Sequence, residues 1–218
     1  MRQTTQTQKE LIEQIRQEAR TYFEGACPSH DWSHVERVYN SCLYIGRVEK
    51  AELFILQLAA LLHDVGRQKE AESPDEICHA QISAEIASGI LKRYQVSGEV
   101  TEQVLHCIIS HRFRNNQKPE TLEAKVLYDA DKLDCIGAIG IARAYAWAGR
   151  QGIRLYSDKD FLGTGYEEEH SPVTEFKYKL RQVKDNLFTE TAKRIAESRH
   201  NCMEMFFERL SKEIEYGV

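Results

Sequence analysis

The sequence predicts an all-α protein, a single domain built as a helical bundle. Runs of alternating β-branched residues and Asn-Gly hairpin turns are absent from its 218 residues. Apolar residues instead recur at helical spacing along most of the chain. With 42% hydrophobic and 29% charged residues, the composition is that of an ordinary globular protein.

The first predicted helices are recognised by their apolar faces. Residues 8–23 form one amphipathic helix and residues 31–49 form another. The segment 52–65 is apolar on nearly all sides, which predicts a helix in the middle of the core. Gly66 is well placed to end that helix.

Start signals and loops divide the rest of the chain. Ser73-Pro74-Asp75-Glu76 combines an N-cap, a proline at the first helical position and a capping-box glutamate, and it predicts a helix that runs to about Tyr94. The stretch 136–142 is rich in Gly and Ala, which suits close helix packing. Residues 151–172 predict a long functional loop. Further helices are expected over residues 98–111, 121–133, 173–187 and 189–214.

Charge and cysteine usage narrow the function classes. The net charge of -5 gives no support to a nucleic-acid polymer or an anionic membrane as partner, whereas a small anionic substrate stays compatible. The six cysteines are scattered without a CxxC pair, which favours free thiols in a reduced compartment. The polar N-terminus lacks the apolar stretch of a signal peptide, and Leu53–Leu62 is too short to span a bilayer. We therefore expect a cytoplasmic protein.

The pair His63-Asp64 ends the most apolar predicted helix. Burying an ionised carboxylate is costly, and the C-terminal end of a helix disfavours negative charge. The nearest Lys or Arg is Arg67, just beyond the helix. A bound cation would resolve both problems. A helix that ends at the surface would instead leave the pair solvated, and the pair alone does not decide between the two.

A polar stripe runs beside the apolar stripe of the helix predicted over 31–49. Its members, His30, His34, Arg37 and Ser41, follow one another at helical spacing. Two histidines at i and i+4 are a common metal arrangement, and an arginine on the same face could hold a phosphate oxygen. The alternative is an exposed polar face.

An acidic residue also faces the core from the helix predicted over 121–133. Asp131 follows Ala124 and Leu127 at helical spacing and therefore points with the apolar face. Spacing alone does not separate it from Asp134, one turn further along. Asp129 points elsewhere and is expected to be solvated.

The order of these residues resembles the HD-domain superfamily of metal-dependent phosphohydrolases. The contexts HDWSHVERV, AALLHDVGR, YDADKLDCIGAIGIAR and ETAKRIAESRHNCMEMFFERL are similar to an uncharacterised bacterial branch of it. The resemblance implies an HD-type domain over residues 25–218, preceded by an N-terminal helix over residues 1–24. Residues 171–180 are only loosely similar to the family, so no substrate contact is inferred from them.

The resemblance also implies a site. The family's metal ligands fall on His34, His63, Asp64 and Asp131, which selects Asp131 over Asp134. His79 and His111 are placed like the additional histidines of two-metal members, and they would bind a second ion, contact phosphate or be satisfied core histidines.

Such a site takes one divalent ion, Mn, Fe, Ni, Zn or Mg, and has room for a second. Asp64 and Lys132 are the expected catalytic residues: Asp64 would orient or deprotonate a water, and Lys132 would neutralise charge on a phosphate oxygen. Arg37 and His30 are expected at the substrate or the second ion. The alternative for Lys132 and Arg37 is an ion pair with neighbouring acids.

The expected function is hydrolysis of a phosphate ester or anhydride, with a nucleotide as substrate, by a phosphatase or a nucleoside triphosphate pyrophosphatase. The alternatives are a metal-containing nucleotide sensor without turnover and a purely structural helical protein. The apolar C-terminal stripe is either core or the contact of a homodimer; it consists of Met203, Phe206, Phe207 and Leu210.

Overall fold

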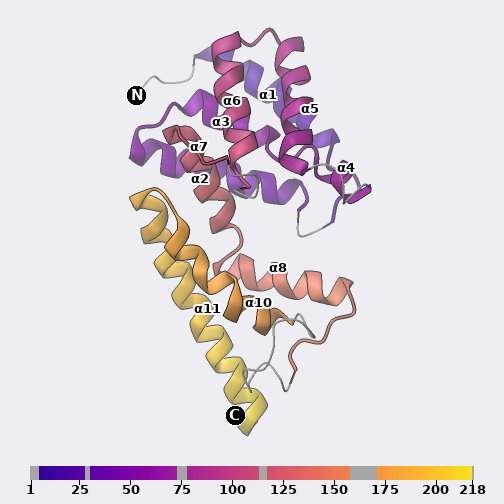
Figure 1. Cartoon of the computed structure of the whole chain (residues 1–218), viewed down its shortest axis with the longest axis vertical. Helices are drawn as coiled ribbons and strands as arrows, with labels where there is room; N and C mark the ends of the chain where they lie inside the picture. Colours follow the sequence, from indigo (N-terminus) through magenta and orange to yellow (C-terminus); the bar gives the residue numbers. More distant parts are fainter. Residues whose placement is uncertain (1–4, 28–29, 73–77, 113–116, 158–170, 218) are drawn as a thin grey trace. The chain divides into compact units, whose positions relative to one another are not determined.

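The computed structural model describes residues 5–27, 30–72, 78–112, 117–157 and 171–217. Every regular element within these ranges is a helix, so the predicted all-α fold is confirmed (Figure 1). In chain order these are α1 (Gln6–Thr21), α2 (Trp32–Glu49), α3 (Leu53–Leu62), α4 (Arg67–Glu72), α5 (His79–Arg93), α6 (Gly98–Ser110), α7 (Leu122–Leu133), α8 (Gly137–Arg150), α10 (Pro172–Tyr178), the 3-10 helix η1 (Leu180–Asn186) and α11 (Glu190–Tyr216).

Most of the helices begin at a residue whose side chain caps them. Thr5 forms a capping box with Gln8 at the start of α1. The Asp31 carboxylate accepts hydrogen bonds from the backbone N–H groups of Ser33 and His34, which fixes the first turn of α2. Ser171 caps α10, with Pro172 following it. These caps explain why helix starts are readable from sequence.

One expected element differs from the structure, one observed element was not expected, and two expected segments lie outside the described residues. The short helix α4 was not predicted, because six residues carry too little periodicity. The predicted helix over 173–187 is wrong as one element: Lys179 leaves the helical region, with φ -128 and ψ -56, and the tighter helix η1 follows. The start signal at 73–76 and residues 158–170 of the predicted loop lie outside the described residues.

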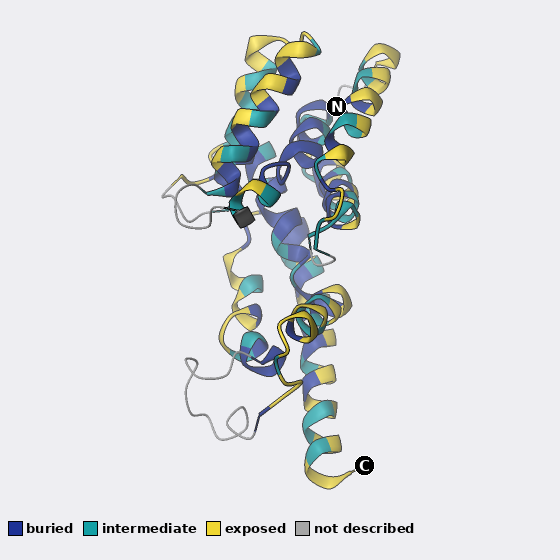
Figure 2. Cartoon of the chain, turned by 90° about the vertical axis from the view of Figure 1, so that its right-hand side faces the viewer, coloured by how far each residue is buried: buried dark blue, intermediate teal, exposed yellow. Residues whose placement is uncertain are grey.

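The contacts divide the chain into two compact units, and the first comprises Met1–Asp131. Helix α3 is its centre and packs against α1, α2, α5 and α6. Eight of the ten residues of α3 are buried. Figure 2 shows that buried residues gather in the interior of this unit. The chain that leaves the C-terminal end of α3 therefore starts inside the core. The predicted division between residues 24 and 25 stays a prediction.

The second unit comprises Lys132–Val218. Helix α11 packs against α8 and η1, and α10 packs against α8 and η1. Phe207 is buried and stacks on Phe176 with ring centroids 4.4 Å apart, and Met203 is fully buried, so these two residues of the C-terminal stripe belong to the core. Phe206 is 38% exposed. Among the described residues, no helix is long and apolar enough to cross a membrane.

Candidate metal centre

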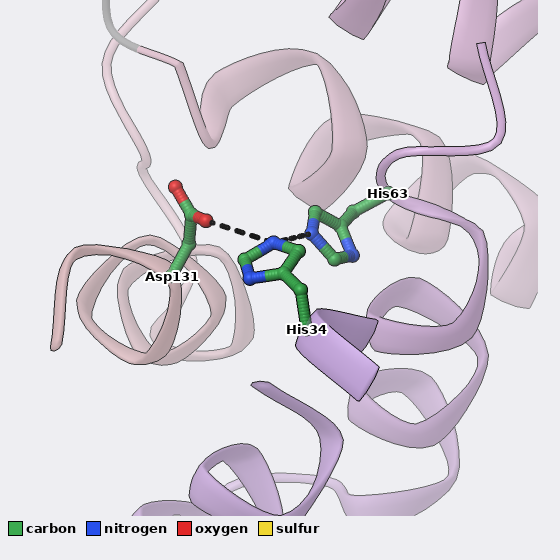
Figure 3. A group of neighbouring side chains, drawn as sticks. All are labelled: His34, His63 and Asp131. Carbon is green, nitrogen blue, oxygen red and sulfur yellow. Dashed lines mark hydrogen bonds and ion pairs between the residues drawn. The ribbon is translucent and has the colours of Figure 1, made fainter. Parts of the chain in front are cut away.

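Three helices bring the first group of donor atoms together. His34 comes from the first turn of α2, His63 is the C-cap of α3, and Asp131 lies near the end of α7. The Nε2 atom of His34 lies 3.3 Å from Nε2 of His63 and 3.5 Å from Oδ1 of Asp131 (Figure 3). Both histidines are fully buried. Three residues far apart in sequence thus converge on one point.

A second group of donors lies on the other side of Asp64. His79 is the first residue of α5, and His111 is the C-cap of α6. Their Nε2 atoms lie 3.3 Å apart, and they lie 3.3 Å and 3.6 Å, respectively, from Oδ1 of Asp64. Both rings are buried. His79 and His111 are therefore part of the same centre as His63, whose ring centroid lies 5.3 Å from that of His111.

Asp64 connects the two groups. Its Oδ2 lies 3.6 Å from Nε2 of His34 and 3.8 Å from Nε2 of His63, whereas its Oδ1 faces the second group. The residue is 1% exposed. Oδ1 is buried and accepts no hydrogen bond of ordinary geometry among the described residues. A buried carboxylate oxygen without such a bond is costly unless a cation lies beside it.

The turn that carries His63 and Asp64 is held against α5. The backbone N–H of Gly66 donates to Oγ of Ser83 at 2.9 Å. A Cβ atom at Gly66 would lie 2.5 Å from the backbone nitrogen of Ser83, which no real contact allows. Gly66 was expected to end α3, but α3 ends at Leu62. Its structural role is to let two backbones touch, which places Asp64 beside His79.

Hydrogen bonds at Nδ1 fix the direction of two of the rings. Nδ1 of His63 donates to the carbonyl of Ala60 at 2.7 Å, and Nδ1 of His111 donates to the carbonyl of Ile108 at 2.5 Å. In a neutral imidazole the other nitrogen, Nε2, then carries a lone pair. Metal-bound histidines are held in this way by a partner on the far side of the ring.

The electrostatics keep His63, His79 and Asp64 in the charge states that metal ligands need. Burial lowers the pKa of His63 to about 4 and the pKa of His79 to about 3, against the opposing effect of Asp64, so both rings are neutral at pH 7. Burial alone would raise the pKa of Asp64, but the charge of Arg67 and the neighbouring histidines hold it well below its usual value. Neutral imidazoles and an ionised carboxylate are what a divalent cation requires.

The spacing of the donors fits a metal ion. Two sets of three ligand atoms each lie within 4.8 Å of one another: His34, His63 and Asp131, and Asp64, His79 and His111. Ligand atoms about 2.1 Å from a common ion lie about 3 to 3.5 Å apart, close to the distances seen within each set. The residues present therefore fit a metal.

A family model for the HD domain matches residues 31–136, a range that contains all six donors. The uncharacterised protein YpgQ of Bacillus subtilis is 39% identical over 212 residues, which cover 94% of this chain and 96% of YpgQ. This chain belongs to the HD-domain superfamily. The superfamily predicted by resemblance is thereby confirmed.

Solved structures of HD-domain proteins share the fold. A crystal structure of Bacillus subtilis YpgQ in complex with ADP aligns with a TM-score of 0.76 and 33% identity, covering 96% of this chain and 98% of the other. A crystal structure of an HD-superfamily hydrolase from Bacillus thuringiensis aligns with a TM-score of 0.76 and 32% identity, covering 96% and 99%.

The two acidic residues beside Asp131 in sequence, one before it and one after it, are also buried. Asp134, the alternative left open by spacing, is 3% exposed and accepts a hydrogen bond from Nη1 of Arg143 at 2.7 Å. Asp129 was expected to be solvated, and this is wrong, because it is fully buried. Helix α7 is enclosed on nearly all sides, so it has no solvent face for Asp129; its buried apolar residues are Ala124, Val126, Leu127, Tyr128, Ala130 and Leu133.

The remaining predicted residues lie near these ligands in sequence. The ring centroid of His30 is 5.6 Å from that of His34, and His30 is half-buried. Arg37 donates from Nη1 to Oγ of Ser33 at 2.9 Å. Lys132 follows Asp131 on α7 and is half-buried. Their expected roles stay predictions.

For three charged residues of the centre, no role was predicted from the sequence. Nε of Arg67 donates to Oδ2 of Asp64 at 2.8 Å. Glu70 accepts from the backbone N–H of His79 at 3.2 Å and also pairs with Arg112. Arg67 was detectable, because it lies three residues after Asp64. No sequence pattern indicates that Glu70 and Arg112 belong to the centre. They lie near His79 only because of how α4 packs against the ends of α5 and α6.

Proposed function

We propose that this chain is a metal-dependent phosphohydrolase that acts on a nucleotide. The observation that carries the proposal is that two clusters of imidazole and carboxylate ligands meet at the buried side chain of Asp64. One oxygen of this carboxylate accepts no hydrogen bond among the described residues. A structural protein gains nothing from five charged or imidazole side chains buried around one carboxylate. A metal centre explains all of them.

We assign the ligands in two sets. His34, His63, Asp64 and Asp131 would hold one divalent ion, and Asp64, His79 and His111 would hold a second, with Asp64 shared between the two. Imidazole with carboxylate suits Mn²⁺, Fe²⁺, Ni²⁺, Zn²⁺ and Mg²⁺. When bound, a divalent ion supplies Lewis acidity toward a phosphoryl oxygen and makes a nearby water easier to deprotonate.

The chain's own residues would orient the substrate. Asp64 would also orient the attacking water. Arg67 uses Nε for Asp64, and its other N–H donors suit phosphate oxygens, since the side chain is 30% exposed. Lys132 and Arg37 are further candidates to neutralise charge on the phosphate.

A nucleotide substrate is supported by the relatives. The crystal structure of YpgQ contains ADP, and the chain aligns with YpgQ over nearly its full length. The bond cleaved would be a phosphate monoester or the α–β anhydride of a nucleoside triphosphate. A nucleotide sensor that keeps the metal without turnover is the alternative.

The test is release of phosphate and pyrophosphate from nucleoside mono-, di- and triphosphates, each with Mg²⁺, Mn²⁺, Ni²⁺ and Zn²⁺. Wild type is compared with Asp64→Asn, with Asp131→Asn and with Asp185→Asn, a control at an exposed residue of η1. Turnover that survives only in wild type and the control supports the proposal, and the product identifies the bond. Metal binding without any turnover would favour the sensor, and no metal binding would refute the ligand assignment.

A further inference from the structure

One atom of the second donor group has two incompatible partners. Nδ1 of His79 lies 3.0 Å from Oε2 of Glu70 and 2.7 Å from Nη1 of Arg112. An ionised carboxylate only accepts hydrogen bonds, and a guanidinium only donates them. A single imidazole nitrogen cannot donate and accept at once, so the two contacts require opposite tautomers of the neutral His79 ring.

The two tautomers have opposite consequences at Nε2. When Nδ1–H donates to Glu70, Nε2 carries the lone pair that a metal ligand needs. When Nδ1 accepts from Arg112, Nε2 carries the proton instead. Nε2 of His111, 3.3 Å away, would then accept that N–H, because Nδ1 of His111 donates to the carbonyl of Ile108.

Glu70 and Arg112 are held in place for this choice. Arg112 pairs with Oε1 of Glu70, and Nη1 of Arg112 also lies 3.4 Å from Sγ of Cys78. Oε1 of Glu70 accepts the backbone N–H of His79 as well. The Glu70 and Arg112 side chains are only 19% and 23% exposed. The ion pair is therefore held beside the His79 ring. Its donor, Arg112, and its acceptor, Glu70, both face the same ring nitrogen, Nδ1.

We propose that Glu70 and Arg112 are positioning residues that select the tautomer of His79 and so control binding of the second ion. The inference rests on the proposed two-ion centre. In the metal-free protein Arg112 donates to Nδ1, and Nε2–H donates to Nε2 of His111. Loading of the second ion moves that one proton from Nε2 to Nδ1 by exchange with water, where Glu70 accepts it, and the net charge of the ring does not change.

The first donor group has no such competition at His63, whose Nδ1 is fixed by the carbonyl of Ala60. The ion between His34, His63 and Asp131 therefore binds first. The ion at His79 and His111 binds second and more weakly, because its site must change tautomer. This order distinguishes the two halves of the centre.

The experiment combines metal titration with the tautomer of His79. Calorimetric titration with Mn²⁺ gives two affinities, and long-range ¹H–¹⁵N correlation spectra of the metal-free and Zn²⁺-loaded protein report which nitrogen carries the proton. The variants are Glu70→Met, Arg112→Met and the double variant. Glu18→Met and Arg93→Met are matched controls, because Glu18 and Arg93 form an ion pair elsewhere. Glu70→Gln keeps an oxygen that can accept the Nδ1–H of His79. Comparison with this variant shows whether weaker metal binding in Glu70→Met results from misfolding.

We expect Glu70→Met to weaken the second ion about 10- to 100-fold and to leave the first unchanged. Arg112→Met should tighten the second ion and shift the metal-free ring to the Nδ1–H tautomer, and Glu70→Gln should bind close to wild type. Equal weakening of both ions in Glu70→Met, a single ion in wild type, or an Nδ1–H tautomer in the metal-free wild type would overturn the proposal. If no ion binds at all, the proposed function fails, and the metal-free tautomers of wild type and Arg112→Met still decide whether the pair selects them.

Discussion

The Nε2 atoms of His34 and His63 face each other across 3.3 Å inside a fully buried part of the first unit. His63 donates from Nδ1 to Ala60, so its Nε2 lone pair points at its neighbour. An ion between the rings would bind that lone pair, and His34 contributes a second lone pair at Nε2 when its proton is on Nδ1.

Metal should consequently stabilise the folded chain. An ion that binds only the native state adds about 2.7 kcal/mol at a concentration 100 times its Kd. We expect the melting temperature in Mn²⁺ to rise by several degrees and to fall when EDTA is added, as measured by circular dichroism. The Asp64→Asn variant should show no such rise. A melting temperature that does not depend on metal would argue against the centre.

Asp64 and Asp131 should differ in how many ions they hold. Asp64 faces both donor groups, whereas Asp131 belongs to one. We expect Asp64→Asn to lose both ions and Asp131→Asn to retain the one at His79 and His111, measured as metal per chain after dialysis. Loss of activity should exceed about 100-fold in both, since even residues that only support a ligand cost 10- to 100-fold. Identical stoichiometry in the two variants would refute a shared Asp64.

Asp134→Asn tests the alternative that spacing left open. Asp134 is buried against Arg143, so removing its charge leaves a nearly buried guanidinium without its carboxylate. The cost to folding should be about 3 kcal/mol, measured by urea unfolding. Metal content should not change. A loss of metal without a loss of stability would move the ligand from Asp131 to Asp134.

Gly66→Ala should destabilise the protein. Its Cβ would lie 2.5 Å from the backbone nitrogen of Ser83, and backbone cannot move aside as a flexible side chain can. We expect a loss of about 1–3 kcal/mol in urea unfolding. Gly149→Ala, in α8, meets nothing within 4 Å and should be neutral or stabilising by up to about 1 kcal/mol. Equal effects at both positions would contradict the contact.

The cysteines should differ in reactivity. Burial raises the pKa of Cys107 to about 12 and holds the pKa of Cys42 well above its usual value, so neither forms a thiolate at pH 8 in the folded protein. Cys202 is exposed. Alkylation with iodoacetamide at pH 8, followed by peptide mass spectrometry, should label Cys202 and spare Cys42 and Cys107. Labelling of the two buried thiols at the same rate would indicate that the core opens.

The sequence predicted the helices that carry long apolar stripes and strong caps, such as α2 and α3. Both signals are local, so neither depends on tertiary contacts. It could not predict η1, where the backbone of Lys179 departs from helical geometry within a segment of uniform composition. The six donors were named in advance, four as ligands and two with their role open, and the structure brings all six together.

The residues that were missed or misplaced depend on tertiary contacts. Asp129 was expected to be solvated but is fully buried. That expectation assumed that a polar residue marks a solvent face. Glu70 and Arg112 are separated by 42 residues, and no periodicity links them.

The contact at Gly66 has a consequence for transplanting this centre into another protein. The backbone of α5 passes so close to the chain two residues after Asp64 that a Cβ atom at Gly66 would lie 2.5 Å from the backbone nitrogen of Ser83. Copying the His-Asp pair onto the end of a designed helix would reproduce the ligands, but nothing would orient their side chains toward the other ligands. A graft would need a second helix whose main chain passes at the same distance, so the smallest portable unit is a pair of crossing helices and not a motif in one of them.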